Sequence, residues 1–324
     1  MSGPRVEADD MDLLVLRDGV HRLPAADYAD ALRDRLPDHT VTHARTPGEE
    51  RNYAATADVV TGPRIEPELL EAAGDPDLFA CTYAGTGHLP YEALSTANVA
   101  VTSAAGVHAP NAAEHAVGAV LSFSRRLHEA ARADRWQPAD PEELAGSTVT
   151  VVGLGAIGTA VADRLEPFDV TTLGVRRHPD AGGPTDEVFG PEALDEALAR
   201  TDYLLLCCPL TDATRGLIGT AELRTLPLTA VVVNVARGAV VDTEALVRTL
   251  RRGRLGGAVL DVTEPEPLPD DHPLWGFEDV VITPHTAGAT PNYYDRLADI
   301  VADNVGRLEN DRPLRNAVQP AERP

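Results

Sequence analysis

The chain has 324 residues, 43% of them hydrophobic, and carries 51 acidic against 28 basic residues, a net charge of −23. A chain of this length exceeds one typical core, so the sequence predicts two domains of a soluble globular protein. Its negative charge repels nucleic acid and anionic membranes, and neither is expected as a partner. No apolar run approaches the ~20 residues that cross a bilayer. The start of the chain has no apolar leader, which predicts a cytoplasmic protein.

All the basic residues are arginine, because the sequence contains no lysine. This excludes chemistry that depends on a lysine side chain: Schiff-base catalysis, the Walker A phosphate site and the tyrosine–lysine pair of short-chain dehydrogenases. The three cysteines, Cys81, Cys207 and Cys208, cannot form a disulfide framework. No His or Cys cluster lies near Cys207 and Cys208 in the sequence, so no metal site is predicted.

The acidic excess predicts a protein from a salt-loving, haloarchaeal organism. A soluble domain commonly carries a net charge of only about 2–8 in magnitude. At a net charge of −23, repulsion among the acidic side chains destabilises the folded protein in dilute salt. This repulsion is screened when the Debye length falls to ~3 Å near 1 M salt. We therefore expect the midpoint of thermal unfolding to rise steeply from about 0.1 M to multimolar KCl. A flat response in circular-dichroism melts would support the alternative, an ordinary acidic bacterial enzyme.

In chain order, short apolar runs first predict buried parallel strands, with crossover helices around residues 28–32 and 67–70. The runs are Leu13–Leu16, Asp58–Val60, Leu78–Cys81 and Val99–Val101. A long helix follows Pro110, with Asn111 as its expected N-cap and an apolar stripe through Val117, Val120 and Leu121. Such a stripe needs a partner surface, so this helix is the candidate element of a homodimer.

The second half of the chain repeats the pattern of apolar run, turn and helix. Strands are expected at residues 149–152, 170–175, 203–208, 231–235, 258–260 and 280–282. A final helix after Pro291 is expected to return to the first domain. The sequence thus predicts an α/β protein of two Rossmann-like or flavodoxin-like, doubly wound parallel-sheet domains with a cleft between them. Residues 1–103 plus 290–324 would form the substrate-binding (catalytic) domain, and 104–289 the nucleotide-binding domain.

A glycine turn joins the strand at 149–152 to the next helix. Gly153, Gly155 and Gly158 have the spacing that permits a tight turn, close approach of a pyrophosphate and packing of helix on strand. The pyrophosphate would bind at the helix N-terminus, beside Ala156 and Ile157, where unpaired N–H groups favour anions. The alternative is a helix-packing turn without a ligand.

The end of the next strand indicates which dinucleotide is bound. An acid about 20 residues beyond the glycines normally bonds the ribose hydroxyls of NAD. Arg176 and Arg177 stand there instead, and guanidinium groups pair with a 2′-phosphate. NADP(H) is therefore the preferred cofactor, with NAD(H) possible. The alternative is a pair of solvated surface arginines.

Three more polar residues follow the ends of predicted strands: Arg237, Glu266 and His285. Individually, Arg237 could cap a helix, Glu266 could be a solvated acid and His285 could be a structural histidine. Ligands bind outside the carboxyl ends of parallel strands, so all three are expected at one sheet edge beside the glycine turn. A guanidinium, a carboxylate and an imidazole there predict a redox active site.

Long, ordered motifs extend through most of residues 80–290. These are Gly153–Gly158, Cys208–Ile218, Val233–Gly238, Ala258–Val262, Glu264–Leu268 and Thr283–Gly288. With these motifs the chain resembles the D-specific 2-hydroxyacid dehydrogenase family, which includes glyoxylate/hydroxypyruvate reductases. The resemblance implies reduction of a 2-ketoacid to the D-2-hydroxyacid, with Arg237 binding the substrate, His285 as general acid/base and Glu266 holding the imidazole.

The resemblance also implies cofactor contacts from Pro209, Thr214, Ala236, Asp261, His285 and Gly288, with Asp261 receiving the nicotinamide carboxamide. Ala84, Gly85 and Thr86 would bind the substrate carboxylate with their N–H groups, unless they form only a glycine-rich turn. Gly87 stands where relatives often have an acid. The rival function is a nucleotide-sensing, corepressor-like scaffold without significant turnover. A dehydrogenase for phosphorylated or amino-acid-derived acids would differ only in its pocket.

Overall fold

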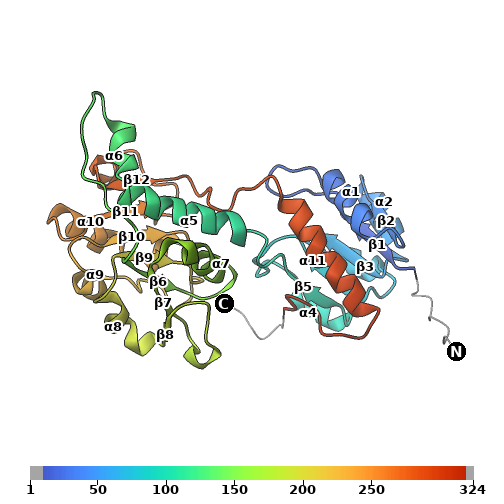
Figure 1. The fold of residues 1–324 in the computed structure, drawn as a ribbon. Helices are drawn as coiled ribbons and strands as arrows, with labels where there is room; N and C mark the ends of the chain where they lie inside the picture. Colours follow the sequence, from blue (N-terminus) through green and yellow to red (C-terminus); the bar gives the residue numbers. More distant parts are fainter. Residues whose placement is uncertain (1–9, 319–324) are drawn as a thin grey trace. The chain divides into compact units, whose positions relative to one another are not determined.

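The computed structural model describes residues 10–318 and divides into two compact units. Unit 1 contains the described residues up to Val107 together with those from Thr290 onward, and unit 2 is His108–Ala289. Each unit is built on a wholly parallel sheet (Figure 1). The predicted absence of an N-terminal leader concerns residues outside the described range. No helix among residues 10–318 is long and apolar enough to cross a membrane.

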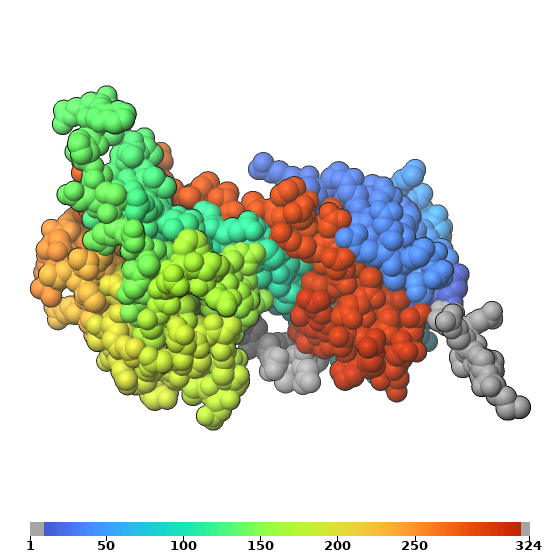
Figure 2. Space-filling view, in the orientation of Figure 1, coloured from blue at the N-terminus to red at the C-terminus, as the bar shows by residue number. Residues whose placement is uncertain are grey.

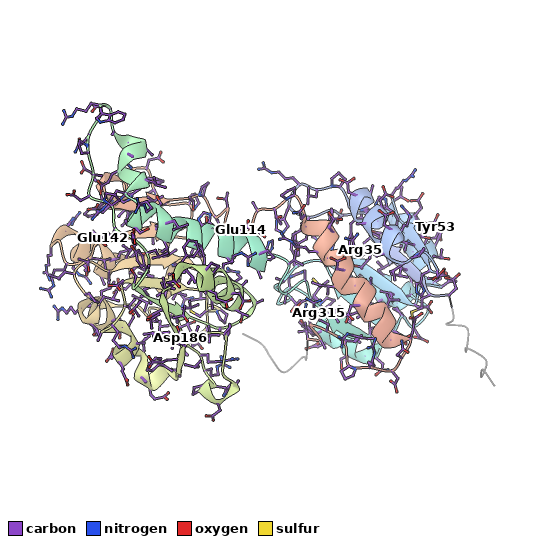
Figure 3. All side chains as sticks on the ribbon, viewed as in Figure 1. Arg35, Tyr53, Glu114, Glu142, Asp186 and Arg315 are labelled. Carbon is purple, nitrogen blue, oxygen red and sulfur yellow. The ribbon has the colours of Figure 1, made fainter. Side chains whose placement is uncertain are left out.

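Unit 1 has a five-stranded sheet in the order β2-β1-β3-β4-β5, which is a doubly wound arrangement. Its strands are β1 (Asp12–Val15), β2 (Thr40–His43), β3 (Val59–Gly62), β4 (Leu78–Cys81) and β5 (Ala100–Thr102). Its helices are α1 (Ala25–Arg35), α2 (Pro47–Ala54), α3 (Pro67–Ala72), α4 (Tyr91–Thr96) and α11 (Tyr293–Leu308). The C-terminal helix α11 packs on α1. Arg35 of α1, labelled in Figure 3, forms ion pairs with Asp295 and Asp299 of α11.

Unit 2 has a seven-stranded sheet in the order β12-β11-β10-β9-β6-β7-β8. Its strands are β6 (Thr148–Val152), β7 (Thr171–Val175), β8 (Glu187–Phe189), β9 (Tyr203–Leu206), β10 (Val231–Asn234), β11 (Gly257–Leu260) and β12 (Val280–Ile282). The strand order reverses between β6 and β9, which is where a doubly wound sheet binds its ligand. The predicted pair of doubly wound parallel-sheet domains is confirmed.

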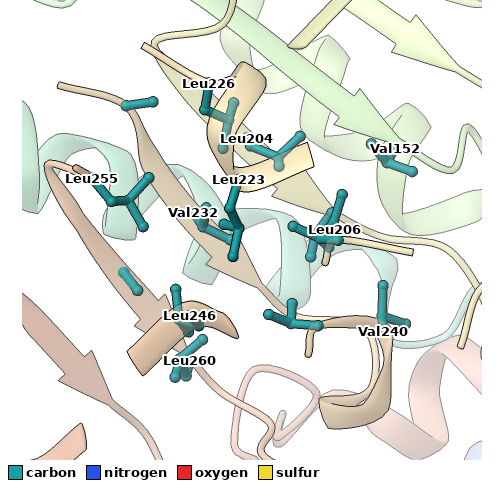
Figure 4. Close-up of a cluster of buried hydrophobic side chains, with 14 of the residues drawn as sticks. Val152, Leu204, Leu206, Leu223, Leu226, Val232, Val240, Leu246, Leu255 and Leu260 are labelled. Carbon is teal, nitrogen blue, oxygen red and sulfur yellow. The ribbon is translucent and has the colours of Figure 1, made fainter. Parts of the chain in front are cut away.

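Helices cover both faces of the unit 2 sheet. They are α5 (Ala109–Ser124), α6 (Leu127–Arg132), α7 (Ala156–Leu165), α8 (Leu194–Leu198), α9 (Thr220–Thr225) and α10 (Thr243–Arg251). Alternate residues of β9 point to opposite faces: Leu204 and Leu206 join one buried cluster (Figure 4), and Tyr203 and Leu205 join the other. Burial on both faces explains why this strand reads as a continuous apolar run.

The predicted start of the long helix is wrong. The helix α5 begins at Ala109 with His108 as N-cap, so Asn111 lies inside its first turn. There the Asn111 amide donates to the carbonyl oxygens of Ala287, at 2.7 Å, and Ala289, at 3.2 Å. Proline is favoured in a first helical turn, which explains why Pro110 lies within the helix.

The apolar stripe of α5 is covered within unit 2. Its buried residues, including Val117 and Val120, pack in the same cluster as Val161 of α7 and Val233 of β10. The stripe therefore does not require a second chain, and the homodimer stays a prediction without support from this helix. After α5, the chain around α6 stands out from the surface of unit 2, and residues 129–143 are exposed (Figure 2).

Candidate active site

Three of the predicted site residues follow neighbouring strands of unit 2 at the same edge of the sheet. Arg237 comes after β10, Glu266 lies beyond β11 and His285 comes after β12. All the strands run parallel, so their carboxyl ends share this edge. The glycine turn after β6 opens at the same edge. The polar residues and the candidate phosphate site thus belong to one side of one sheet.

His285 and Glu266 are in direct contact. The Nδ1 atom of His285 lies 2.6 Å from Oε1 of Glu266, and the two side chains are 48% and 41% exposed. A carboxylate accepts, so Nδ1 carries the proton and Nε2 is the ring nitrogen left for a ligand. The backbone of His285 is left-handed, with a φ of 53°. Such a backbone is uncommon for a residue other than glycine and marks a position fixed by its surroundings.

Asp261 provides those surroundings. Its side chain is 2% exposed, and its Oδ1 accepts hydrogen bonds from the Thr283 hydroxyl at 2.6 Å and the Thr286 N–H at 2.8 Å. Its Oδ2 accepts from the Ala287 N–H at 2.9 Å, and its carbonyl oxygen accepts from the N–H of His285. Asp261, which the sequence predicts to contact the cofactor, therefore also holds the loop that carries His285.

A histidine of α5 also contacts this loop. The Nε2 atom of His115 lies 3.2 Å from the Thr283 hydroxyl and 3.9 Å from Oδ1 of Asp261. At the N-terminus of the same helix, Nδ1 of His108 lies 2.7 Å from the carbonyl oxygen of Gly288, which places Gly288 in the same loop network. Both histidines therefore support the loop in the structure.

The turn that carries Arg237 is closed by Asn234, the last residue of β10. The Asn234 amide donates to the carbonyl oxygen of Arg237 and accepts from the N–H of Ala236, each at 3.0 Å. The exposed Arg237 guanidinium donates to the carbonyl oxygen of Ala236 through Nη1 at 2.7 Å. Sequence reasoning missed Asn234, although a polar residue that ends the run Val231–Val233 was a usable signal.

The glycine turn has the shape that a dinucleotide needs. Gly153 has a φ of +98°, and a Cβ there would lie 2.6 Å from the backbone of Cys208. A Cβ on Gly158 would clash with the carbonyl oxygen of Gly153. At Gly155, in contrast, a Cβ would have no neighbour within 4 Å in the described chain. The first and third glycines are required by packing, and the middle one faces open space at the N-terminus of α7, beside Ala156 and Ile157.

The other predicted cofactor residues lie at the same edge. Arg176 and Arg177 follow β7; Arg176 is half-buried and donates to the carbonyl oxygen of Gly182 at 2.5 Å, and Arg177 is exposed. Pro209 follows β9, and its carbonyl oxygen accepts from the Thr214 hydroxyl at 2.6 Å. This bond makes Thr214 part of the turn itself.

In unit 1 the predicted substrate loop follows β4. Among residues 10–318, the N–H groups of Ala84, Gly85 and Thr86 donate to no protein acceptor. Successive free N–H groups in a turn form a concave anion site. Next to this loop is a hollow of about 480 Å³, lined by Pro63, Arg64, Ile65, Glu66, Pro67, Tyr83, His88 and Pro90. His88 is held there by the carbonyl oxygen of Pro63, at 2.7 Å from its Nε2.

The cysteines are not reactive thiols. Burial raises the pKa of Cys207 to about 12 and that of Cys81 to about 11, and it also raises the pKa of Cys208. A thiol titrating that high is protonated at neutral pH and is a weak nucleophile. Cys207 and Cys208 therefore pack next to the glycine turn without taking part in the chemistry.

Comparisons with known proteins show which family the chain is similar to. The model of the D-isomer specific 2-hydroxyacid dehydrogenase NAD-binding domain matches residues 117–287, just over half of the chain. A glyoxylate reductase of Thermofilum pendens is 38% identical over 262 residues, 77% of each protein. A glyoxylate/hydroxypyruvate reductase of Arabidopsis thaliana is 32% identical over 315 residues, 93% of this chain and 96% of that protein.

A solved structure extends the likeness to the fold of the whole chain. A D-isomer specific 2-hydroxyacid dehydrogenase of Xanthobacter autotrophicus, in complex with NADPH and MES, is 30% identical, with a TM-score of 0.77. The match covers 96% of this chain and 98% of that one. The chain belongs to the D-isomer specific 2-hydroxyacid dehydrogenase family. Membership supports a 2-hydroxyacid dehydrogenase or reductase activity with a nicotinamide dinucleotide.

Proposed function

We propose that the protein reduces a 2-ketoacid to the D-2-hydroxyacid and prefers NADPH. The observation that carries the proposal is the contact of His285 with Glu266 at the sheet edge that also holds Arg237 and the glycine turn. Bound at that turn, the dinucleotide supplies the hydride. The three glycines, the N-terminus of α7 and the two arginines after β7 are the groups that would hold it.

The chain's own residues supply the polar half of the reaction. Arg237 binds the carboxylate and the ketone oxygen of the substrate, which polarises the carbonyl and fixes its orientation. His285 donates the proton from Nε2 to the ketone oxygen as negative charge develops there, and the same atom takes it back in the reverse direction. Glu266 holds the ring and stabilises its charged form from Nδ1, at 2.6 Å.

The preference for NADPH rests on the two residues after β7. Replacing Arg176 with Asp should weaken NADPH binding by at least ~10-fold relative to NADH, because a charge-assisted contact with the 2′-phosphate becomes a repulsion. Fluorescence titration of the two dinucleotides measures this ratio. Arg251→Asp, an exposed arginine on α10, is the matched control for the change of charge. An unchanged ratio in Arg176→Asp would show that the arginines are ordinary surface residues.

A panel of 2-ketoacids, assayed with NADPH and NADH in multimolar KCl, tests the proposed function directly. It should include glyoxylate, hydroxypyruvate and branched aliphatic ketoacids, with chiral analysis of the product. Turnover giving the D-product supports the proposal. A nucleotide-sensing scaffold is the alternative, and the joint presence of Arg237, Glu266 and His285 disfavours it. Binding of dinucleotide without turnover of any ketoacid would favour it.

A further inference from the structure

Away from the proposed active site, unit 2 brings one imidazole and two carboxylates together. His128 and Glu129 belong to α6, and Asp279 immediately precedes β12; one ligand atom from each lies within 4.8 Å of the others. Asp279 stands before β12 and His285 after it. The cluster therefore lies at the opposite end of that strand from the residues proposed for catalysis.

The imidazole of His128 presents a buried nitrogen that has no hydrogen bond. Its side chain is 1% exposed. Nδ1 lies 3.0 Å from the carbonyl oxygen of Ser122, which only accepts, so Nδ1 carries the proton and Nε2 presents its lone pair. In the described chain Nε2 is buried without a hydrogen-bond partner, and it lies 3.9 Å from Oε1 of Glu129. A buried acceptor left unpaired in this way is costly and calls for a ligand.

The ring is also held in place. It stacks on Phe123, with ring centroids 3.9 Å apart and an interplanar angle of 12°. The hydrogen bond to Ser122 fixes the tautomer, as the outer partner of a metal-binding histidine does. The backbone that carries Asp279 is held by Arg132, which donates to the carbonyl oxygens of Glu278 and Val280, each at 2.6 Å.

One imidazole nitrogen and two carboxylates form a ligand set for a first-row divalent transition metal. Calcium and magnesium prefer oxygen alone, whereas zinc binds histidine and carboxylate together. The two carboxylate charges balance the ion. Tetrahedral zinc would place its ligand atoms about 3.4 Å apart, so the carboxylates must close in by about 1 Å. Glu129 and Asp279 are both exposed, so their side chains have room to move. Arg126 pairs with Oε1 of Glu129 at 2.8 Å, so the ion would take Oε2 of this carboxylate.

We propose that His128, Glu129 and Asp279 bind a divalent transition-metal ion of the zinc class, with water completing the coordination. The ion ties α6 to the start of β12 and stabilises unit 2; it takes no part in hydride transfer. The proposal is independent of the proposed function. No metal site was predicted from the sequence, where only the surroundings of Cys207 and Cys208 were considered. Here the first two ligands are separated from the third by almost half the chain.

Zinc and cobalt binding to the whole protein in KCl, after treatment with a chelator, tests the site. Each ion should raise the midpoint of thermal unfolding, and cobalt should produce a visible d–d absorption band. His128→Gln and Asp279→Asn should each weaken binding by at least ~10-fold. Asp279 is exposed, so the second variant removes a ligand without disturbing the core, and it should retain the turnover of the unaltered chain.

Two control variants make the result specific. Asp140→Asn removes an exposed carboxylate from the segment after α6, and His285→Ala removes the imidazole of the proposed active site. Both should bind zinc and cobalt as tightly as the unaltered chain. The proposal is overturned if His128→Gln and Asp279→Asn bind both ions with unchanged affinity, or if His285→Ala is the variant that loses binding.

Discussion

Replacing His285 with alanine should lower kcat for ketoacid reduction by roughly 10²–10⁴-fold, the usual contribution of a positioned general acid. The proton that Nε2 donates must then come from water, while negative charge develops on the ketone oxygen. Dinucleotide binding should change little, because the glycine turn belongs to another strand end. Steady-state kinetics in multimolar KCl, with fluorescence titration of NADPH, measures both quantities. Near-normal turnover in this variant would overturn the mechanism.

Glu266→Gln separates the role of the ring from the role of its partner. The imidazole remains, so turnover should fall less than in His285→Ala. The ring loses the carboxylate at 2.6 Å that fixes its tautomer and orientation, so kcat for ketoacid reduction should still fall clearly. Glu264→Gln is the matched control: this side chain is exposed and lies two residues from Glu266, and within residues 10–318 it forms no ion pair or hydrogen bond with His285. Equal kcat values for the two variants would remove Glu266 from the mechanism.

Arg237→Ala should lower kcat/KM by about 10²–10³-fold or more, since it removes the donor that stabilises the developing oxyanion and binds the substrate carboxylate. We expect kcat to fall and KM to rise, because the same guanidinium acts in the ground state and in the transition state. Arg237→Lys keeps the charge but loses the planar fork and should recover only part of the activity.

The control for Arg237 is another exposed arginine of unit 2. Arg251→Ala changes the net charge equally and should leave kcat/KM unaltered. Melting curves of all the variants show whether the Asn234 turn stays folded. If Arg237→Ala reduces ketoacids as well as Arg251→Ala does, substrate binding must be assigned to another cation.

Strands with a continuous apolar run were the easiest elements to predict. The run Leu78–Cys81, buried throughout, became β4 with the predicted bounds. Val280–Ile282 became the edge strand β12 with the predicted bounds because it is a continuous apolar run, although only Val280 is fully buried. The edge strands β2 and β8 were missed because they are short and only partly buried, so neither has a continuous apolar run. At the start of α5, the preference of Asn for the N-cap was overridden by two hydrogen bonds to the 287–289 backbone.

The same reasoning explains what could be predicted of the site. Motifs and strand ends led to Arg237, Glu266 and His285, because parallel strands deliver the residues that follow them to one edge. The roles of Asn234, Thr283 and His115 could not be predicted, since each depends on a hydrogen bond between separate elements or within a turn. The cluster around His128 could not be predicted for the same reason, because the unpaired state of its Nε2 depends on how the helix packs.

The burial of Asp261 has a practical consequence for any redesign that lowers the net negative charge of the protein. The direct route is to neutralise part of the acidic surface, and most of the 51 acids are candidates for this. In the described part of the chain only Glu50 and Asp261 are buried acids. Asp261 accepts hydrogen bonds from the loop that carries His285 and is not part of the hydrated acidic surface. A redesign that replaces acidic residues without regard to burial would also replace Asp261, and would therefore loosen the loop that carries His285.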